Sequence, residues 1–249
     1  MFEEENTQEA VVEETAVTKK AEAGTPARKG IKLLLCGFEA SGKSTVTSDL
    51  EDTLVINFDQ KDYGFKTPHV NLKNYTSMAD VIEWIGQSLF KYKEHTGKMP
   101  KNIVLDTVTQ LYTLMQNRND EVYTGFESHR NNSKETAELN KFIETRLIPS
   151  GINVIVVAHT IWDEPTKRHV IPATGAFAKS GSWLSIVNDS VFLLKHNGSI
   201  TVHLRSLKYP ARTTLTDLPD SVRVEKYSLQ QHIDALVNTK TAADAFCLD

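Results

Sequence analysis

A short glycine-containing stretch near the start of the chain has the residue types and spacing of a phosphate-binding loop. It fits the pattern G-x-x-x-x-G-K-[ST] at every defined position and reads Gly37-Phe38-Glu39-Ala40-Ser41-Gly42-Lys43-Ser44-Thr45. Glycines let backbone N–H groups turn toward a phosphate, and the start of a following helix adds partial positive charge. Lys43 would reach the outer phosphates and the Ser44 hydroxyl would bind Mg²⁺, so the stretch predicts a nucleotide and metal site.

Asp106 is the expected partner of Ser44 at the metal ion. It follows the apolar run Ile103-Val104-Leu105, within a stretch (102–107) that is typical of a buried strand. An apolar strand that ends in Asp has the form of a Walker B motif, whose carboxylate holds the Mg²⁺ shell beside the loop serine. The pattern is common by itself, but after a Lys-Ser phosphate loop it indicates the second half of the metal site.

Asp59 and Asp62 are candidates for activating a water molecule. Residues 54–58 are expected to form a second strand, which ends at Asp59, and Asp62 lies in the polar loop beyond it. Residues just past the carboxyl ends of parallel strands line the ligand crevice, so either acid could orient or deprotonate an attacking water. A surface carboxylate is the alternative for each, and the sequence does not rank the two.

Three further polar residues follow later strands. His159 ends the apolar run 152–158, where a sensor of the γ-phosphate would sit, although a structural histidine is the alternative. Lys208 and Arg212 come just after a hairpin predicted at 190–204 by its Asn-Gly turn. They could reach the triphosphate of a neighbouring subunit as a cationic finger, or they could form a solvated basic end.

The hydrophobic pattern predicts an α/β fold with a mainly parallel sheet. Strands are expected at 31–36, 54–58, 102–107, 152–159, 190–196, 199–204 and 222–227. Helices are expected at 46–50, 77–95, from 108 to 115, about 136–147 and 228–237, and Ser77 is a plausible cap for the second of them.

Two stretches lack this regular pattern. In 116–138 basic and amide groups surround Tyr123 and Phe126, and 160–182 carries lysine, arginine and histidine between Trp162 and Trp183. Basic groups interleaved with aromatic residues suit a surface that follows a single-stranded backbone and stacks bases. Solvated loops are an equal alternative for the first stretch, whereas a long irregular loop such as the second is usually functional or mobile.

Composition places limits on these interpretations. The chain has 249 residues, 40% hydrophobic and 24% charged, which supports one sizeable core. Its formal net charge of -4 means that any nucleic acid site must be a local patch. Cys36 and Cys247 offer no disulfide framework, so a reducing cytoplasm is the simplest compartment. We expect neither a membrane span nor a signal peptide, and we expect residues 1–29 to form a disordered acidic tail.

The order of these features resembles the RecA-like ATPase core. More narrowly, it resembles the small phage RecA-like ATPases that act in single-strand annealing and recombination. The resemblance covers about residues 30–220 and implies a RecA-like P-loop core with a mainly parallel sheet flanked by helices, plus a C-terminal antiparallel hairpin. We therefore expect a RecA-like ATPase domain at 30–227, after the tail, and a C-terminal helix and tail at 228–249.

The resemblance also implies roles for individual residues. ATP and Mg²⁺ are the implied cofactors, and His159 stands where related recombinases carry a residue that couples nucleotide state to DNA. The stretches 117–135 and 161–181 correspond to two DNA-binding loops, and Lys208, with Arg212 as its companion, corresponds to a lysine that acts across a subunit interface. The glutamate that is the general base in bacterial recombinases has no clear counterpart, since Asp59 ends the equivalent strand.

Implied partners are single-stranded DNA, further copies of the chain in a ring or filament, and a single-strand-binding protein. The N-terminal oligomerisation elements of the large recombinases are not evident in residues 1–29. Three other functions stay open: a nucleotide kinase, a nucleotide-dependent adaptor or loader, and a hexameric motor. A kinase would need an arginine-rich lid, and 161–181 contains only Arg168.

Overall fold

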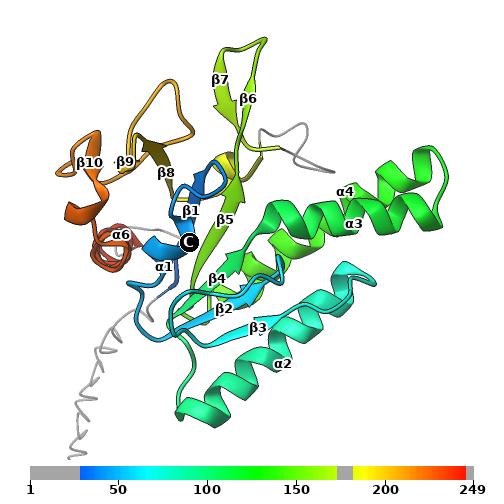
Figure 1. Cartoon of the computed structure of the whole chain (residues 1–249). Helices are drawn as coiled ribbons and strands as arrows, with labels where there is room; N and C mark the ends of the chain where they lie inside the picture. Colours follow the sequence, from blue (N-terminus) through cyan, green and yellow to red (C-terminus); the bar gives the residue numbers. More distant parts are fainter. Residues whose placement is uncertain (1–28, 173–181, 245–249) are drawn as a thin grey trace, which may run out of the picture.

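The computed structural model describes residues 29–172 and 182–244, and within these ranges the chain forms an eight-stranded sheet with helices on both faces (Figure 1). The strand order is β10-β9-β8-β1-β5-β4-β2-β3. The strands from β8 to β3 in this order run parallel, and β9 and β10 are antiparallel additions at one edge. Their bounds are β1 (Lys32–Gly37), β2 (Thr53–Asn57), β3 (His69–Asn71), β4 (Asn102–Asp106), β5 (Asn153–His159), β8 (Asp189–His196), β9 (Ser199–His203) and β10 (Ser221–Arg223).

The helices pack on the two faces of this sheet. The longer ones are α2 (Met78–Thr96), α3 (Val108–Val122), α4 (Phe126–Phe142) and α6 (Leu229–Asp244), and α1 (Lys43–Thr47) is a short helix after the glycine-containing loop. Shorter elements are the π-helical turn η1 (Ile143–Leu147), the 3₁₀ turns η2 (Ser182–Ser185) and η3 (Val224–Lys226), and the two strands β6 (Ile161–Asp163) and β7 (Arg168–Val170). None of the helices in the described ranges is long and apolar enough to cross a bilayer.

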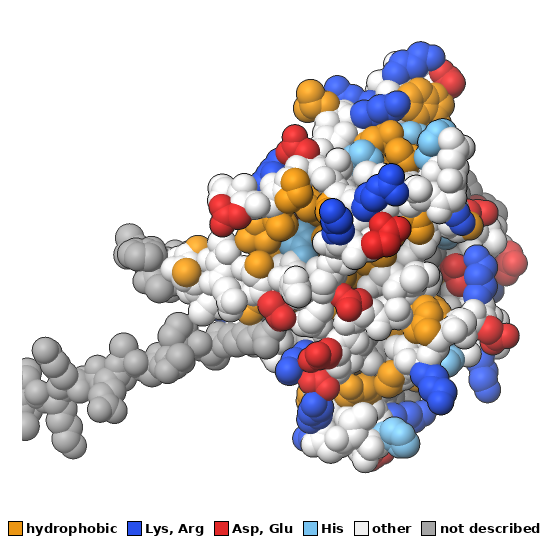
Figure 2. All heavy atoms as spheres, turned by 60° about the vertical axis from the view of Figure 1, so that its left-hand side comes forward, with side chains coloured by type: hydrophobic (Ala, Val, Ile, Leu, Met, Phe, Trp, Pro, Cys, Tyr) orange, Lys and Arg blue, Asp and Glu red, His pale blue; other side chains and the backbone are white. Residues whose placement is uncertain are grey.

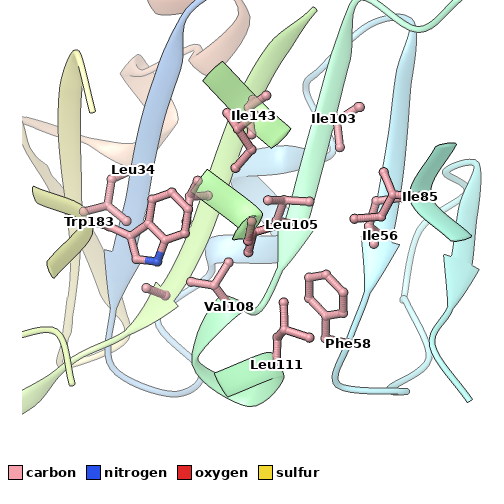
Figure 3. Packing of buried hydrophobic residues seen from close by; sticks show 14 of the residues in the cluster. Leu34, Ile56, Phe58, Ile85, Ile103, Leu105, Val108, Leu111, Ile143 and Trp183 are labelled. Atoms are coloured by element: carbon pink, nitrogen blue, oxygen red, sulfur yellow. The ribbon is translucent and has the colours of Figure 1, made fainter. Parts of the chain in front are cut away.

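Side-chain alternation along the central strands builds a separate core on each face. Leu34 of β1 and Leu105 of β4 are buried toward α2, α3 and α4, together with Ile85 of α2 (Figure 3). The neighbouring Leu33 and Val104 point to the opposite face, where Leu229, Ile233, Leu236 and Val237 of α6 cover them. The prediction that the apolar runs form strands buried on both faces is therefore confirmed. The expected α/β fold with its C-terminal hairpin is confirmed as well.

The helix expected at 77–95 is confirmed as α2, and its two ends have clear local causes. The side-chain oxygen of Ser77 accepts a hydrogen bond from the backbone N–H of Asp80 at 3.2 Å, which caps the first turn. Gly97 ends the helix with φ = 79°, a left-handed conformation that glycine adopts without strain. Met78, Ile85 and Leu89 are buried on one side of the helix, as the periodicity predicts.

The expectation of a loop at 117–135 is wrong, because this stretch belongs to the helical pair α3 and α4. The polar residues that favoured a loop instead join the two helices. Asn119 Nδ2 donates to Asn132 Oδ1 at 2.7 Å and to Glu135 Oε2 at 2.8 Å, and Glu135 Oε1 accepts from the backbone N–H of Met78 at 3.0 Å. A buried polar network has the same composition as a solvated loop, so the residue types alone pointed the wrong way.

Other boundaries also differ from the expectations. The start of the irregular stretch at 160–182 is a β-hairpin, β6 with β7, in which Ile161 pairs with Val170, and 173–181 lie outside the described residues. Strand β3 was not expected, since three residues with only Val70 partly buried carry too little periodicity. The helix after the loop begins earlier than expected, α4 begins at Phe126, β10 is shorter, and α6 continues to Asp244.

A buried ionic cluster fixes α6 to the sheet. Asp189 Oδ2 of β8 lies 3.0 Å from His232 Nε2 of α6, and the Tyr227 hydroxyl lies 2.8 Å from His232 Nδ1. Burial alone raises the pKa of Asp189, but hydrogen bonds from His232, Thr213 and the backbone N–H of Thr214 outweigh it and hold the pKa below its ordinary value. The carboxylate thus stabilises the folded chain while it is charged.

We predict that Asp189→Asn lowers the free energy of unfolding at neutral pH by about 2 kcal/mol, because a buried charged acceptor is lost. Since the folded pKa is depressed, the stabilisation is present above the unfolded value of about 3.9 and is lost as pH falls through the folded value. Urea unfolding at several pH values should therefore show a smaller loss on acidification in the variant. Asp234→Asn, on the exposed side of α6, is the matched control and should change neither quantity.

Candidate functional site

The glycine-containing loop joins β1 to α1 and forms one wall of a cavity of about 660 Å³. Close packing requires the first of its two glycines, and the backbone conformation requires the second. A Cβ on Gly37 would lie 2.6 Å from the carbonyl oxygen of Leu193, and a Cβ on Gly42 would lie 2.8 Å from Ile200 Cδ1. Gly42 also has φ = 91°, which other residues adopt only with strain. The loop is thus held against β8 and β9 with its inner side facing the cavity.

Lys43 is buried, and its amine points back into the loop. Nζ donates to the carbonyl oxygens of Gly37 at 3.1 Å and Phe38 at 2.6 Å. It also lies 3.3 Å from His159 Nδ1. Burial lowers the pKa of Lys43 to about 8, although the nearby Asp106 carboxylate opposes this. An amine that is already removed from water can pass from these carbonyls to a phosphate with little further desolvation.

Ser44 and Asp106 meet across the cavity, as the sequence predicts. Ser44 Oγ lies 3.5 Å from Asp106 Oδ2, although β1 and β4 are separated in the sheet by β5. Burial raises the pKa of Asp106, and hydrogen bonds from Tyr63 and Ser44 act in the opposite direction. A hydroxyl and a carboxylate in a roomy cavity fit Mg²⁺, which takes one or two protein oxygens and keeps several waters.

His159 stands at the end of β5, between the strand of the loop and the strand of Asp106. Its backbone N–H donates to Thr109 Oγ1 at 2.9 Å, which fixes the end of the strand. Burial and the charge of Lys43 both lower the pKa of His159, so its ring is neutral at physiological pH. The structure therefore places His159 beside Lys43, while its role as a sensor stays a prediction.

Asp59 and Asp62 both line the cavity but differ in how they are held. Asp59 is nearly buried, and its Oδ1 accepts from Thr107 Oγ1 at 3.1 Å while its Oδ2 lies 3.2 Å from Lys61 Nζ. Asp62 is exposed. Asp59 is thus the acid with a fixed orientation next to the end of β4, which is the property that a general base needs.

Lys208 and Arg212 do not line this cavity. Lys208 Nζ lies 5.6 Å from the centre of the Tyr209 ring, and the Arg212 guanidinium donates to the carbonyl oxygen of Val187 at 2.5 Å. The interactions described for these two side chains are therefore with residues other than those of the loop. Their predicted role at a triphosphate would require a second copy.

Tyr63 and Lys195 also line the cavity, and the sequence did not single them out. The Tyr63 hydroxyl donates to Asp106 Oδ2 at 2.9 Å, and burial followed by the charge of Asp106 raises the pKa of Tyr63. Its position four residues after Asp59 was the available signal, because the loop after that strand was already expected at the crevice. Lys195 lies on β8, whose place beside β1 could not be known before the sheet order.

Comparison with known proteins supports the interpretation of this cavity. A family model described as an AAA domain matches residues 29–178, which is more than half of the chain. The matched segment contains the loop as well as Asp59, Asp106 and His159, and it ends before β8. A search among curated proteins found no match.

We predict that Gly42→Ala weakens phosphate binding in this cavity and lowers the free energy of unfolding by about 1–2 kcal/mol. The positive φ strains the backbone of a residue that has a Cβ, and the added methyl group would lie 2.8 Å from Ile200 Cδ1. Calorimetric titration with ATP and thermal unfolding measure the two effects. Gly86→Ala, in α2 with open space around it, is the matched control and should leave binding unchanged while keeping or raising the melting temperature.

Proposed function

Because the chain belongs to the AAA domain family, we propose that it binds ATP with Mg²⁺ and hydrolyses the nucleotide in the cavity beside the glycine-containing loop. The observation that carries the proposal is the meeting of Lys43, Ser44 and Asp106 in that cavity. These residues come from the start of α1, directly after the loop, and from the end of β4, and together they supply a buried cation and two oxygen ligands. A nucleoside triphosphate and its metal ion require this set of protein groups.

The chemistry assigned to the residues is attack of water on the γ-phosphate in line with the leaving group. Loop N–H groups and the Lys43 ammonium stabilise the charge on the transferring phosphoryl group. When bound by Ser44 and Asp106, Mg²⁺ neutralises charge on the outer phosphates. Asp59, held by Thr107, orients the water and accepts its proton.

We further propose that the protein is a RecA-like ATPase of the phage type that binds single-stranded DNA and promotes annealing or recombination. The β6–β7 hairpin supports this proposal, because it starts two residues after His159 and carries Lys167 and Arg168 as well as the exposed Trp162. Figure 2 shows Lys and Arg side chains beside hydrophobic ones and an acidic one at the upper end of the molecule, where Figure 1 places this hairpin. Such a surface suits a single strand, whose phosphates need cations and whose bases need aromatic faces.

A second surface of similar chemistry lies where α3 turns into α4. Tyr123 and Phe126 are exposed there, Phe126 by 82%, and Arg118 and Arg130 lie nearby in the sequence. Although the stretch is helical and not the loop that was expected, its exposed aromatic and basic side chains keep the composition that favours a single strand. We propose it as the second contact surface for DNA.

Assembly into a ring or filament follows from the proposed finger. Lys208 and, with it, Arg212 would approach the triphosphate of a neighbouring copy, since neither reaches the cavity of its own chain. His159 would sense the γ-phosphate next to Lys43 and shift the β6–β7 hairpin, which would couple hydrolysis to DNA affinity. We place this activity in the cytoplasm, with a single-strand-binding protein as a further partner.

We predict that Lys43→Ala abolishes ATP hydrolysis, because the cation at the outer phosphates is lost.

Lys208→Ala should also abolish hydrolysis while it leaves binding of nucleotide to the single chain nearly intact. Phosphate release and calorimetric titration measure the two quantities. Lys91→Ala, an exposed lysine on α2, is the control for removal of one charge. Normal turnover in Lys208→Ala would eliminate the finger across subunits.

We predict that single-stranded DNA stimulates hydrolysis and that the stimulation declines as the salt concentration rises. The logarithm of the DNA-binding constant should fall with the logarithm of the salt concentration, with a slope of about -0.7 per phosphate contact. The double variant Lys167→Ala, Arg168→Ala should reduce this slope by about 1.4 if both cations contact phosphates. Lys91→Ala with Lys93→Ala removes two charges from α2 and is the matched control. An ATPase that DNA does not stimulate would favour a kinase or an adaptor, and turnover with added nucleoside monophosphates would separate these two.

A further inference from the structure

Tyr63 contacts the carboxylate that is proposed to hold the metal ion. Its hydroxyl donates to Asp106 Oδ2 at 2.9 Å, and the same oxygen lies 3.5 Å from Ser44 Oγ. We propose that Tyr63 is a positioning residue that orients the Asp106 carboxylate for Mg²⁺ and thereby makes nucleotide binding dependent on the metal. This inference rests on the proposed function, since it requires the cavity to bind a nucleotide with Mg²⁺.

The need for such a residue follows from the surroundings of Asp106. Its side chain is buried, and the 3.5 Å separation from Ser44 Oγ is at the outer limit of a hydrogen bond. Tyr63 supplies the shorter contact of the two. A carboxylate whose orientation depends on one short hydrogen bond rotates more freely when that bond is removed, and a metal ligand that is poorly oriented binds more weakly.

The position of Tyr63 is fixed by the turn that follows β2. The side chain of Asn57 organises this turn, because its Oδ1 accepts from the backbone N–H groups of Asp59 and Gln60 at 3.1 Å each. Its Nδ2 donates to the carbonyl oxygen of Lys61 at 2.9 Å. These bonds hold 59–61 in one conformation, so the chain reaches Tyr63 at a defined place over the end of β4.

The ring of Tyr63 is held in addition to its hydroxyl. Its centre lies 5.5 Å from the ring of Phe65 and 5.3 Å from the ring of His69, the latter in an edge-to-face arrangement. Removal of the hydroxyl alone therefore leaves the ring packed. This separates the hydrogen bond from the packing, which makes Tyr63→Phe a clean variant.

The same turn connects Asp106 to the candidate base. Thr107 Oγ1 donates to Asp59 Oδ1 at 3.1 Å, and Tyr63 bonds to Asp106, so 59–63 is attached at two points to adjacent residues at the end of β4. The carboxylate for the metal and the carboxylate for the water are thus parts of one connected unit. We expect loss of the Tyr63 hydroxyl to affect the metal half of this unit first.

The test is binding of fluorescent ADP to full-length wild-type protein and Tyr63→Phe, each with Mg²⁺ and with EDTA. In wild type Mg²⁺ should strengthen binding. In Tyr63→Phe binding in EDTA should match wild type, whereas the strengthening by Mg²⁺ should fall by about tenfold. The Mg²⁺ concentration for half-maximal ATP hydrolysis should rise by a similar factor. Tyr92→Phe, on α2 and outside the cavity lining, is the matched control and should behave as wild type.

Each outcome has one meaning. Equal strengthening by Mg²⁺ in wild type and Tyr63→Phe would overturn the positioning role and leave the proposed ATPase intact. An equal loss with and without Mg²⁺ would also overturn it, because a residue that only supports the fold would weaken both kinds of binding. If wild type binds no nucleotide under either condition, the proposed function fails and this inference fails with it.

Discussion

The candidate site depends on the register of four neighbouring parallel strands. Gly37 pairs with His159, and Asn57 pairs with Asp106, so β1 and β5 end at one level and β4 and β2 end at another. The pairing of Leu105 with Val156 sets the two levels two residues apart, at the same edge of the sheet. Residues that directly follow those ends therefore converge on one cavity without any long insertion to carry them. A slip of one residue in any pair would turn His159 or Asp106 toward the opposite face of the sheet, because successive side chains point to opposite sides.

Because these strands are buried on both faces, a change of register would cost a large free energy of burial. Leu33 and Leu34 enter different cores, and so do Val104 and Leu105, which means that a shifted strand would expose apolar side chains on both sides at once. The two helical layers thus position the site even though they contribute few residues to it. The buried pair of Asp189 and His232 serves the same purpose at the C-terminal side, where it holds α6 over β8.

Much of the arrangement could be predicted from sequence because the relevant signals are local. Apolar runs identify the strands, and the spacing from Gly37 to Ser44 identifies the loop. The expectation for 117–135 failed because the partners of Asn119, Asn132 and Glu135 lie on another turn or another helix, so a buried amide looks like a solvated one. Lys195 was missed for a related reason, since the neighbours of β8 are set by sheet order, which no local pattern encodes.

Coupling between the nucleotide cavity and a distant surface needs a chain of packed groups with more than one arrangement. Phe38 can begin such a chain. Its carbonyl oxygen accepts from Lys43, and its ring meets His169 of β7 edge-on with centres 4.7 Å apart. His169 in turn stacks on Tyr209, and its backbone N–H donates to the carbonyl oxygen of Lys208 at 3.3 Å. In the proposed function, a phosphate that binds the Lys43 amine would take this donor from the carbonyl oxygen of Phe38. The Phe38 ring contacts the β6–β7 hairpin at His169, and through His169 it is linked to the turn that carries the proposed finger, so packed groups connect the loop to both surfaces.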